Sequence, residues 1–475
     1  MKQLKNSTES PTAGVSWPIF AVTVAAAFMV ALDLSIVNVA FPSIRTSFVD
    51  VSNATLSWVL AAYSVVFGAL LLGAGRIADR SGRRRIFLTG LAVFALGSLV
   101  CGAAPTVLVL IGGRAVQAVG AALLMPASLA LLLAATAPRA RAQVVAMWGG
   151  ISALAVATGP SLGSLLIDAG GWRWAFLVNL PIVMMVGALT RRIVPESQTG
   201  GPLPDLVGIG IVTAAVGALA LAITQGSDWG WSSVSVVTLF GLSVGLLPVV
   251  IARSRRHDAP AIDLDLFRIR TVAIANAATL LYAIGFFGML LANVLFLTSV
   301  WGYSTLAAGL AITPGPLVVA VLSGPAGRLA GRHGYASVLV AGGVIFAAGL
   351  AWYVVLVGEE AQFLTHWLPG SLLVGVGVAL SFPVLSAAAV ADVPPERFAV
   401  GGAMNQTARQ LGAVVGVAVL IAVLGTPTST AQALDRFRSA WVVAIVAVLA
   451  SAGVSSLHRR AAAVVEPMVT AGGVT

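Results

Sequence analysis

Charged side chains are scarce in this chain of 475 residues: Asp, Glu, Lys and Arg make up 9% of it, against 59% hydrophobic residues. A soluble domain carries about 25% charged residues, so the composition excludes an ordinary soluble protein and points to a lipid environment. The net charge is +10. The basic residues stand in short clusters between apolar runs, whereas nucleic-acid binders place them along one exposed face, so no nucleic-acid partner is expected.

Cysteine and histidine are also rare. The single cysteine, Cys101, lies within an apolar run, which excludes a disulfide within the chain and indicates a packed core thiol. The four histidines are scattered, and no Walker sequence is present to bind nucleotide phosphates. We therefore predict no enzyme activity, no metal and no cofactor; the energy must come from an ion gradient, or no energy source is used.

What the chain does have is fourteen apolar runs of spanning length. They cover 17–41, 55–74, 86–104, 107–134, 143–167, 174–190, 206–225, 233–251, 271–300, 306–326, 336–357, 367–390, 399–424 and 439–457. A transmembrane helix needs about 20 apolar residues, and only helices satisfy their own backbone in lipid at such lengths. The sequence thus predicts an all-α polytopic membrane protein with 14 transmembrane helices.

The basic residues predict the orientation. If both termini are cytoplasmic, 21 of the 27 Lys and Arg residues fall on the inside. Four fall outside, namely Arg45, Arg173, Arg436 and Arg438, and two lie within spans. This asymmetry indicates a multi-pass protein of the cell (cytoplasmic or inner) membrane with both tails inside. Dropping the seventh and eighth runs together would keep the same orientation, but would leave them as a long apolar cytoplasmic loop.

A polar motif occurs twice, 252 residues apart. Gly75–Arg85 reads GRIADRSGRRR, and Gly327–Gly334 reads GRLAGRHG, so the two halves of the chain are related. Each copy is expected to be a polar hairpin between two helices. Asp79 of the first copy is replaced by Gly331 in the second, which places the charge chemistry mainly in the first half.

The first copy is predicted to form a cytoplasmic latch between the halves. Its members are Gly75, Asp79, Arg80, Gly82, Arg83 and Arg84. Glycines permit tight turning and close helix approach. Asp79 could cap a helix N-terminus or pair with an arginine across the halves. Alternatively, the arginines only enforce topology, which is our interpretation of Arg85.

Asp33 is the single acid within the fourteen runs, and an intramembrane carboxylate is a functional candidate by default. Asp33 lies nine residues before Pro42 and Arg114 nine residues after Pro105, so both sit about 13 Å from the outer surface. A proton-coupling pair of Asp33 and Arg114 is therefore predicted. Structural alternatives are an acid satisfied by a neighbouring helix and an arginine bound to free carbonyls.

Other polar residues within the runs are candidates for the lining of a substrate cavity, although each alone is more typical of packing or anchoring. They are Asn38, Trp58, Tyr63, Gln117, Asn276, Tyr282, Asn293, Asn405 and Arg409. Asn405 and Arg409 are four residues apart, on one helical face. Arg409 is expected near the midplane, where it could contact substrate, serve the latch or satisfy a neighbouring helix.

Two further stretches have local signatures. Gly159, Pro160 and Gly163 lie inside the fifth run, where proline kinks a helix and small residues admit a close neighbour. The longest inside connector, 253–270, carries charges of both signs and is expected to be a solvated linker or an interfacial helix. Asp263 and Asp265 alone do not complete a metal site.

With these motifs in view, residues 17–457 resemble the fourteen-helix drug:proton antiporters of the major facilitator superfamily, such as QacA-like and EmrB-like exporters. Gly75–Arg84 is similar to the signature G-x-L-A-D-R-x-G-R-R/K, with Ile77 for Leu. The stretch LDLSIVNVAFP, residues 32–42, is similar to the first-helix signature, with Ser for Thr at position 35.

Three more motifs carry the same resemblance. Arg114-x-x-Gln117 fits the fourth-helix signature, with Ala118 for Gly, and G-P-x-x-G at 159–163 fits the fifth-helix antiporter signature, with Ser164 for its last Gly. The stretch W-R-W-x-F-x-x-N-x-P, residues 172–181, also resembles this branch. The resemblance implies a latch role at Asp79 and proton coupling at Arg114. Ser371 stands opposite Arg114 when Pro383 is matched to Pro126, so coupling is expected in the first half only.

The resemblance implies two six-helix bundles with two inserted helices. The predicted units are tail 1–16, bundle 17–190, inserted helices 7 and 8 with their linkers 191–270, bundle 271–457 and tail 458–475. The implied function is proton-coupled export of amphipathic drugs, antibiotics or related small molecules by alternating access, with the bilayer, protons and substrate as partners and a monomeric chain. The alternative on the same fold is an uptake symporter or facilitator of a small metabolite.

Overall fold

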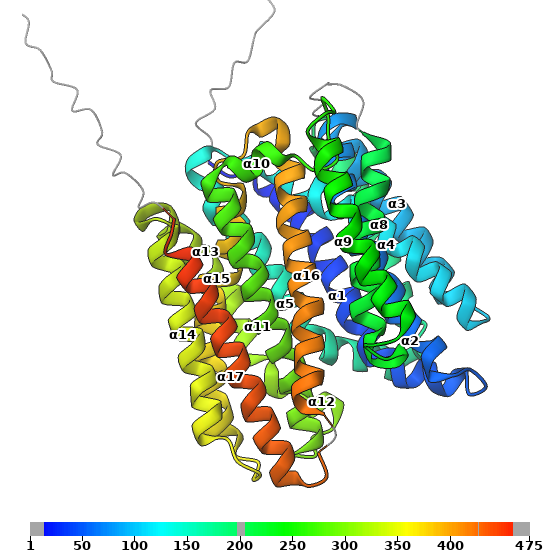
Figure 1. The fold of residues 1–475 in the computed structure, drawn as a ribbon, viewed down its shortest axis with the longest axis vertical. Helices are drawn as coiled ribbons and strands as arrows, with labels where there is room; N and C mark the ends of the chain where they lie inside the picture. Colours follow the sequence, from blue (N-terminus) through cyan, green and yellow to red (C-terminus); the bar gives the residue numbers. More distant parts are fainter. Residues whose placement is uncertain (1–13, 197–204, 426, 459–475) are drawn as a thin grey trace, which may run out of the picture.

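The predicted membrane spans are helices in the computed structural model, which describes residues 14–196, 205–425 and 427–458 (Figure 1). Within these ranges, thirteen helices are long and apolar enough to cross a membrane. A bent pair, Pro138–Val156 and Ser161–Gly170, gives a fourteenth, with a bend of 48° at the Gly159-Pro160 motif. The described residues contain no β-strand, only one isolated bridge between Val15 and Thr136. Most of both predicted tails lies outside these ranges.

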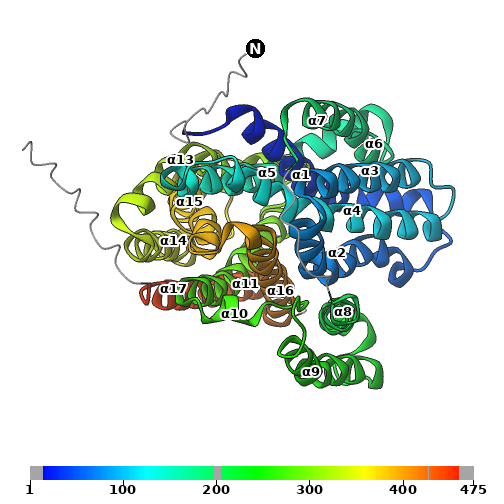
Figure 2. The ribbon, with the colours of Figure 1, turned by 90° about the horizontal axis from the view of Figure 1, so that it is seen from above.

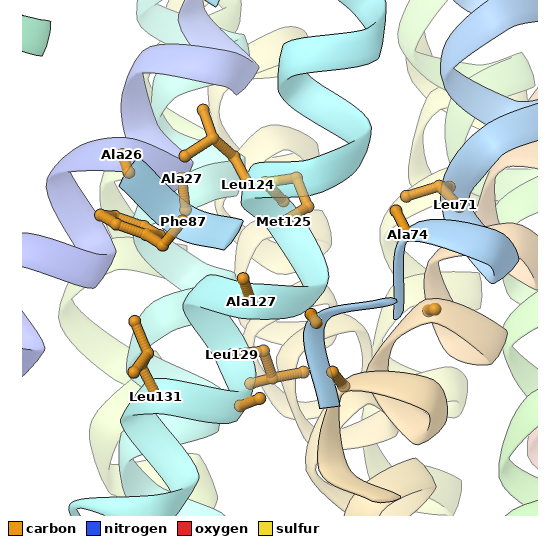
Figure 3. Packing of buried hydrophobic residues seen from close by; sticks show 14 of the residues in the cluster. Ala26, Ala27, Leu71, Ala74, Phe87, Leu124, Met125, Ala127, Leu129 and Leu131 are labelled. Carbon is orange, nitrogen blue, oxygen red and sulfur yellow. The ribbon is translucent and has the colours of Figure 1, made fainter. Parts of the chain in front are cut away.

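The first half contributes six spans. They are α1 (Trp17–Ser47), α2 (Asn53–Ser81), α3 (Arg83–Gly102), α4 (Val107–Ala134), α5 (Arg141–Gly170, after the short η1, Pro138–Ala140) and the pair α6 (Trp174–Leu177) and α7 (Asn179–Ile193). Helices α3 and α4, α1 and α5, and α2 and α4 pack side by side. Apolar residues of α1 to α5 and α7 form a shared core, and Figure 3 shows the part of it where Ala27, Phe87 and Leu124 lie close together.

The second half repeats this arrangement. Its spans are α11 (Arg270–Ser299), α12 (Thr305–Ile312) with α13 (Pro314–His333), α14 (Tyr335–Leu356), α15 (Leu368–Val390, after η2, Phe363–Trp367), α16 (Phe398–Leu424, after η3, Pro395–Arg397) and α17 (Thr430–Ser455). A second core cluster belongs to these helices. The two bundles meet where α2, α4 and α5 contact α13, α15 and α16.

Two helices stand outside both bundles. Helices α8 (Leu206–Trp229) and α9 (Val234–Ser254) pack against each other, and α8 lies against α2 and α16 at the edge of the molecule (Figure 2). Only 17% of the most apolar stretch of α9 is buried inside the protein. The rest of its apolar surface is therefore available to lipid. A connector with the short helix α10 (Leu264–Arg268) leads from α9 to α11.

The repeated polar motifs are less hairpin-like than the sequence predicts. Helix α2 continues through the motif to Ser81, and α13 continues to His333. The turn itself is one residue in each copy, Gly82 with φ of 100° and Gly334 with φ of 84°. Charged side chains at the membrane edge are compatible with a continuing helix, whereas only glycine adopts positive φ readily. We call the end of the molecule with both motifs the arginine-rich face.

Candidate proton-coupling site and interbundle latch

A buried ion pair joins α1 to α4 inside the first bundle. Arg114 Nη1 donates to Asp33 Oδ2 at 2.7 Å, and both side chains are fully excluded from solvent. These are the two residues whose distances from Pro42 and Pro105 predict a common depth. Because the pair is buried among helices, removing one partner would leave an uncompensated buried charge.

Two amides complete the environment of the carboxylate. Gln117 Nε2 donates to Asp33 Oδ1 at 2.7 Å, and Asn179 Nδ2 donates to the same atom at 2.9 Å. Both amides also donate to Ser98 Oγ, at 2.8 Å and 3.4 Å. Donors from α4 and α7 therefore hold the carboxylate of α1, Ser98 of α3 binds the two amides, and both carboxylate oxygens are satisfied.

Sequence reasoning did not name Ser98 or Asn179 as site residues. Asn179 stood within the quoted W-R-W motif and is an amide at the start of an apolar run, which was a usable signal. Ser98 carried none. Its position depends on Gly97, where a Cβ atom would come within 2.5 Å of the Gln117 backbone nitrogen, so α3 approaches α4 closely only because Gly97 has no side chain.

Arg114 has further contacts besides Asp33. Its Nε donates to the carbonyl of Val59 at 3.2 Å, so the predicted alternative of a carbonyl-bound arginine is realised together with the ion pair. The guanidinium carbon lies 4.1 Å from the ring centroid of Tyr63, a distance typical of a cation–π contact. Two buried atoms of this group, Arg114 Nη2 and Tyr63 Oη, have no hydrogen-bond partner among the described residues.

A hydrogen bond connects α1 to α5, which forms one wall of a small cavity between the bundles. Ser35, two residues after Asp33, donates from Oγ to the Val156 carbonyl of α5 at 2.6 Å. The same wall is tightly packed: a Cβ on Gly159 would come within 2.2 Å of Ser35 Oγ, and one on Gly163 within 3.4 Å of Ile36 Cα. The small residues predicted in the fifth helix therefore serve the α1–α5 contact.

Asp79 joins the two halves at the arginine-rich face. Its carboxylate accepts hydrogen bonds from the backbone N–H groups of Ala399 and Val400 in the first turn of α16, at 3.2 Å and 3.0 Å. It also accepts from Arg83 Nη2 of its own half at 2.8 Å. Free N–H groups and the positive end of the helix dipole favour a carboxylate at this position. Of the two predicted alternatives, the geometry is that of an N-terminal cap.

The other predicted latch residues have different surroundings. Arg83 also donates to the Pro395 carbonyl of the second half, and a Cβ on Gly75 would come within 2.7 Å of the Ala399 carbonyl oxygen. Arg84 instead donates to the Arg191 carbonyl within the first half.

Gly82 forms the turn, Arg80 lines a cavity at this face, and Arg85 is exposed. The interbundle contact therefore uses Gly75, Asp79 and Arg83.

The second copy of the motif closes the same face from the other side. A Cβ on Gly327 of α13 would come within 2.6 Å of the Ala142 carbonyl oxygen and 2.7 Å of Gln143 Cα, in the first turn of α5. Gly331 lies where the first copy has Asp79, and supplies no carboxylate. Both motifs thus meet the start of a helix of the opposite bundle, and the interface is closed at this face.

The connector before α11 is solvated only in part: the Asp265 and Arg268 side chains of α10 are 68% and 85% exposed, whereas another of its acids is buried. Asp263 is 4% exposed and pairs with Arg76 of α2 at 3.6 Å and with Arg397 of the second half at 3.0 Å. Arg76 Nε also donates to the Pro260 carbonyl at 2.9 Å. Two arginines from opposite halves leave a local excess of positive charge, which explains why this acid is drawn under the surface.

A small cavity of about 50 Å³ lies between α5 and the second bundle. Its wall includes Val156, Phe286, Asn293, Ser371 and Val378. Sites for drug-sized ligands hold about 300–1,000 Å³, so this cavity must widen to admit one. Asp33 and Arg114 do not line it; Val156, whose carbonyl accepts from Ser35, does.

The predicted cavity residues do not gather in one place. Asn293 lines the cavity, whereas Gln117 binds Asp33 and Tyr63 packs against Arg114. Asn38 is exposed, and Trp58 faces Trp229 of α8.

The remaining predicted cavity residues belong to the second bundle. Asn276 donates to the Val272 carbonyl of its own helix. Tyr282, Asn405 and Arg409 are buried where α11, α15 and α16 meet.

A family model agrees with this architecture. The model described as Major Facilitator Superfamily matches residues 23–205 and 275–467. The chain belongs to the major facilitator superfamily. The matched ranges leave out α8 and α9, the two helices that stand outside the bundles of this superfamily protein.

Individual superfamily proteins are similar over most of the chain. "Multidrug resistance protein Stp" of Mycobacterium tuberculosis is 38% identical over 402 residues, which is 84% of this chain and 74% of that protein. "Cephamycin export protein CmcT" of Amycolatopsis lactamdurans is 34% identical over 434 residues, covering 90% and 89%. Among solved structures, the human organic anion transporter MFSD10 superposes with a TM-score of 0.66 over 91% of this chain. The superposition covers 99% of the MFSD10 chain, and the sequences are 15% identical, so this likeness concerns the fold alone.

Proposed function

We propose that this protein exports amphipathic, drug-like small molecules from the cytoplasm across the cell membrane in exchange for protons. The names of its relatives, a multidrug resistance protein and an export protein, support export. The observation that carries proton coupling is the Asp33–Arg114 pair, fully buried and held by Gln117 and Asn179. Within the proposal, the arginine-rich face is cytoplasmic, as the positive-inside distribution predicts.

Coupling follows from the cost of an unpaired buried charge. When Asp33 takes up a proton, Arg114 loses its counter-charge in a dry interior, and breaking such a pair costs about 3–5 kcal/mol. A rearrangement that hydrates Arg114 lowers this cost. The protonated and deprotonated states therefore favour different conformations, and alternating access by the two bundles uses that difference.

The packing provides a route from the proton site to the substrate cavity. Ser35 binds the Val156 carbonyl, and Val156 lines the cavity. A shift of α1 on release of Asp33 is thus transmitted to α5, which contacts α12, α13 and α15 of the second bundle. Closing of the arginine-rich face by Asp79 and Gly327 would accompany opening of the cavity towards the outside.

Expression of the chain in an efflux-deficient bacterial host tests the proposal, with drug resistance as the measurement. The chain should raise resistance to members of a compound panel, and a protonophore should remove that resistance. Asp33→Asn, which keeps the size of the side chain but not its charge, should abolish it. Asp435→Asn is the matched control, because the Asp435 side chain is 77% exposed. Active export by the Asp33→Asn protein against a gradient would contradict proton coupling at this site.

The direction of transport separates export from uptake on the same fold. In inside-out vesicles with an acidic interior, an antiporter accumulates substrate in exchange for protons. A symporter in the same vesicles loses preloaded substrate together with protons.

A further inference from the structure

Arg409 of α16 is a buried cation without an acidic partner. Its residue is 9% exposed. Nη2 donates to Ser386 Oγ and, at 3.5 Å, to Asn405 Oδ1, both of which are neutral acceptors. Nε is buried without any hydrogen-bond partner. Within residues 14–196, 205–425 and 427–458, no carboxylate forms an ion pair with Arg409.

The comparison with the other deeply buried arginines makes this unusual. Arg114 is paired with Asp33 and Arg83 with Asp79. A buried charge is ordinarily paired, because transfer of an isolated charge out of water is very costly. Arg409 therefore has an unmet requirement for a negative group, and the described protein does not supply one.

The surroundings of Arg409 suit an aromatic molecule. Its guanidinium carbon lies 4.2 Å from the ring centroid of Phe382. Phe382 lies 4.9 Å from Phe286 and 5.9 Å from Tyr282, measured between ring centroids. Phe286 also lines the cavity described above. A row of aromatic rings thus leads from the cavity to the unpaired guanidinium.

We propose that Arg409 binds the carboxylate or another anionic group of the transported compound, whose apolar part lies against Phe286 and Phe382. The exported substrate is then an amphipathic organic anion. This inference rests on the proposed export function and specifies its substrate class. A guanidinium can donate two parallel hydrogen bonds to a carboxylate, and Nε is one of the donors that this requires.

The charge of the substrate changes the driving force. Exchange of one proton inward for one monovalent anion outward moves two positive charges inward, so an inside-negative potential accelerates export. Exchange of one proton for one monovalent cation moves no net charge. Exchange of one proton for one neutral molecule moves one positive charge inward. Transport that moves two charges per exported molecule, with one proton exchanged, is therefore a consequence of the proposal.

Three matched fluorescent probes test binding to the purified full-length chain. Dansylglycine carries a carboxylate, its methyl ester is neutral, and N-(2-aminoethyl)dansylamide is cationic. Wild-type protein should bind dansylglycine more tightly than the other two. Arg409→Gln should weaken the binding of dansylglycine by about 10- to 100-fold, the effect of losing charge-assisted hydrogen bonds. The affinity for the methyl ester should not change. The dansylglycine affinity of Arg409→Lys should lie between those of the wild type and Arg409→Gln.

Several outcomes overturn the proposal. One is that wild type does not prefer the carboxylate probe, or binds none of the three probes. Another is that wild type and Arg409→Gln bind dansylglycine with equal affinity. Folding is checked by thermal unfolding: Arg409→Gln without ligand should melt no lower than wild type, and dansylglycine should stabilise only the wild type. Dansylglycine stabilising both proteins alike also overturns it. Asp33→Asn separates the two proposals, because it should stop proton-driven transport yet keep the preference for dansylglycine over its methyl ester.

Discussion

The amide of Asn179, at the start of α7, lies 2.9 Å from the carboxylate of Asp33 and donates to it. The two residues are 146 positions apart in sequence, and this bond ties the last span of the first bundle to the first. Ser98 Oγ accepts from the same amide. Any movement that releases Asp33 must therefore also break a contact between α1 and α7.

Removal of that amide should uncouple transport without destroying the fold. Asn179→Ala deletes one of the donors to Asp33 and leaves Arg114 and Gln117 in place. The free energy of unfolding should therefore fall by about 1.5–3 kcal/mol, the effect of losing a hydrogen bond to a charged group. Fewer protons should be transported per substrate molecule, as measured with a pH-sensitive dye and labelled substrate in proteoliposomes. Asn38→Ala, on an exposed residue, is the control. An unchanged ratio in Asn179→Ala would show that Asn179 is only structural.

Loss of the Asp79 cap should open the arginine-rich face. Asp79→Ala removes the acceptor for the N–H groups of Ala399 and Val400, and loss of a helix cap costs about 0.5–2 kcal/mol. The open state should therefore gain about 2- to 30-fold in population. Labelling of Ser323→Cys by an impermeant maleimide in inside-out vesicles reports this, because Ser323 meets Gly150 at the closed interface. The background is Cys101→Ser.

Arg85→Ala is the control for this measurement, because Arg85 is exposed at the same face. Equal labelling of the Asp79→Ala and Arg85→Ala proteins would contradict a latch at Asp79.

Asp263 should act as a weaker second tie between the halves. Its bridge to Arg76 and Arg397 should give a coupling energy of about 0.2–1 kcal/mol for the Asp263–Arg397 pair, since the Arg397 side chain is 41% exposed and solvent screens it. A double-mutant cycle of Asp263→Ala and Arg397→Ala, read by the same maleimide labelling, measures the coupling. Strictly additive effects would exclude an energetic tie.

The contact between α1 and α5 should discriminate two glycines of one motif. Gly159→Ala places a Cβ 2.2 Å from Ser35 Oγ, whereas Gly163→Ala meets Ile36 at an ordinary 3.4 Å. Overpacking costs about 1–3 kcal/mol, so Gly159→Ala should lower the melting temperature and transport much more than Gly163→Ala. Ser35→Gly should partly restore the Gly159→Ala protein. The same loss in both alanine variants would place the importance of the motif elsewhere.

The ion pair between Asp205, at the start of α8, and Arg253, near the end of α9, should be lost only at low pH. Burial raises the pKa of Asp205, but hydrogen bonds from Arg253 and the Gly208 N–H outweigh it, so the pKa lies below its ordinary value. The stabilisation is thus present above the ordinary pKa of the unfolded chain, and is lost as the pH falls through the lower folded pKa. Asp205→Asn should lower the melting temperature at pH 7, and the difference from wild type should shrink as the pH falls below about 3.9, the ordinary pKa of Asp. A constant difference across this range would contradict the ion pair as its cause.

The sequence predicts the helices and the central pair well, because both depend on local or one-dimensional information. Apolar run length determines the spans, and counting residues from Pro42 and Pro105 places Asp33 and Arg114 at one depth. Ser98 was missed because its approach depends on helix packing at Gly97. Asn179 was missed because its contact with Asp33 joins residues that are 146 positions apart in sequence. Asp263 appeared solvated because the two arginines that bury it come from distant segments.

The predicted cavity shows the same limit more strongly. Polar residues in apolar runs were selected by chemistry alone, and rotation about each helix axis decides which of them faces a cavity. Asn293 does, Asn38 does not, and Trp58 faces an inserted helix whose position the sequence does not specify.

The central claim is that Asp33 carries the transported proton, and substrate-induced proton release tests it most directly. Purified protein in weakly buffered detergent solution receives a compound that the wild type exports, and a pH indicator records released protons. We predict release by wild type and by Asp435→Asn, and none by Asp33→Asn although it still binds the compound. Proton release of the same size from Asp33→Asn would contradict the account.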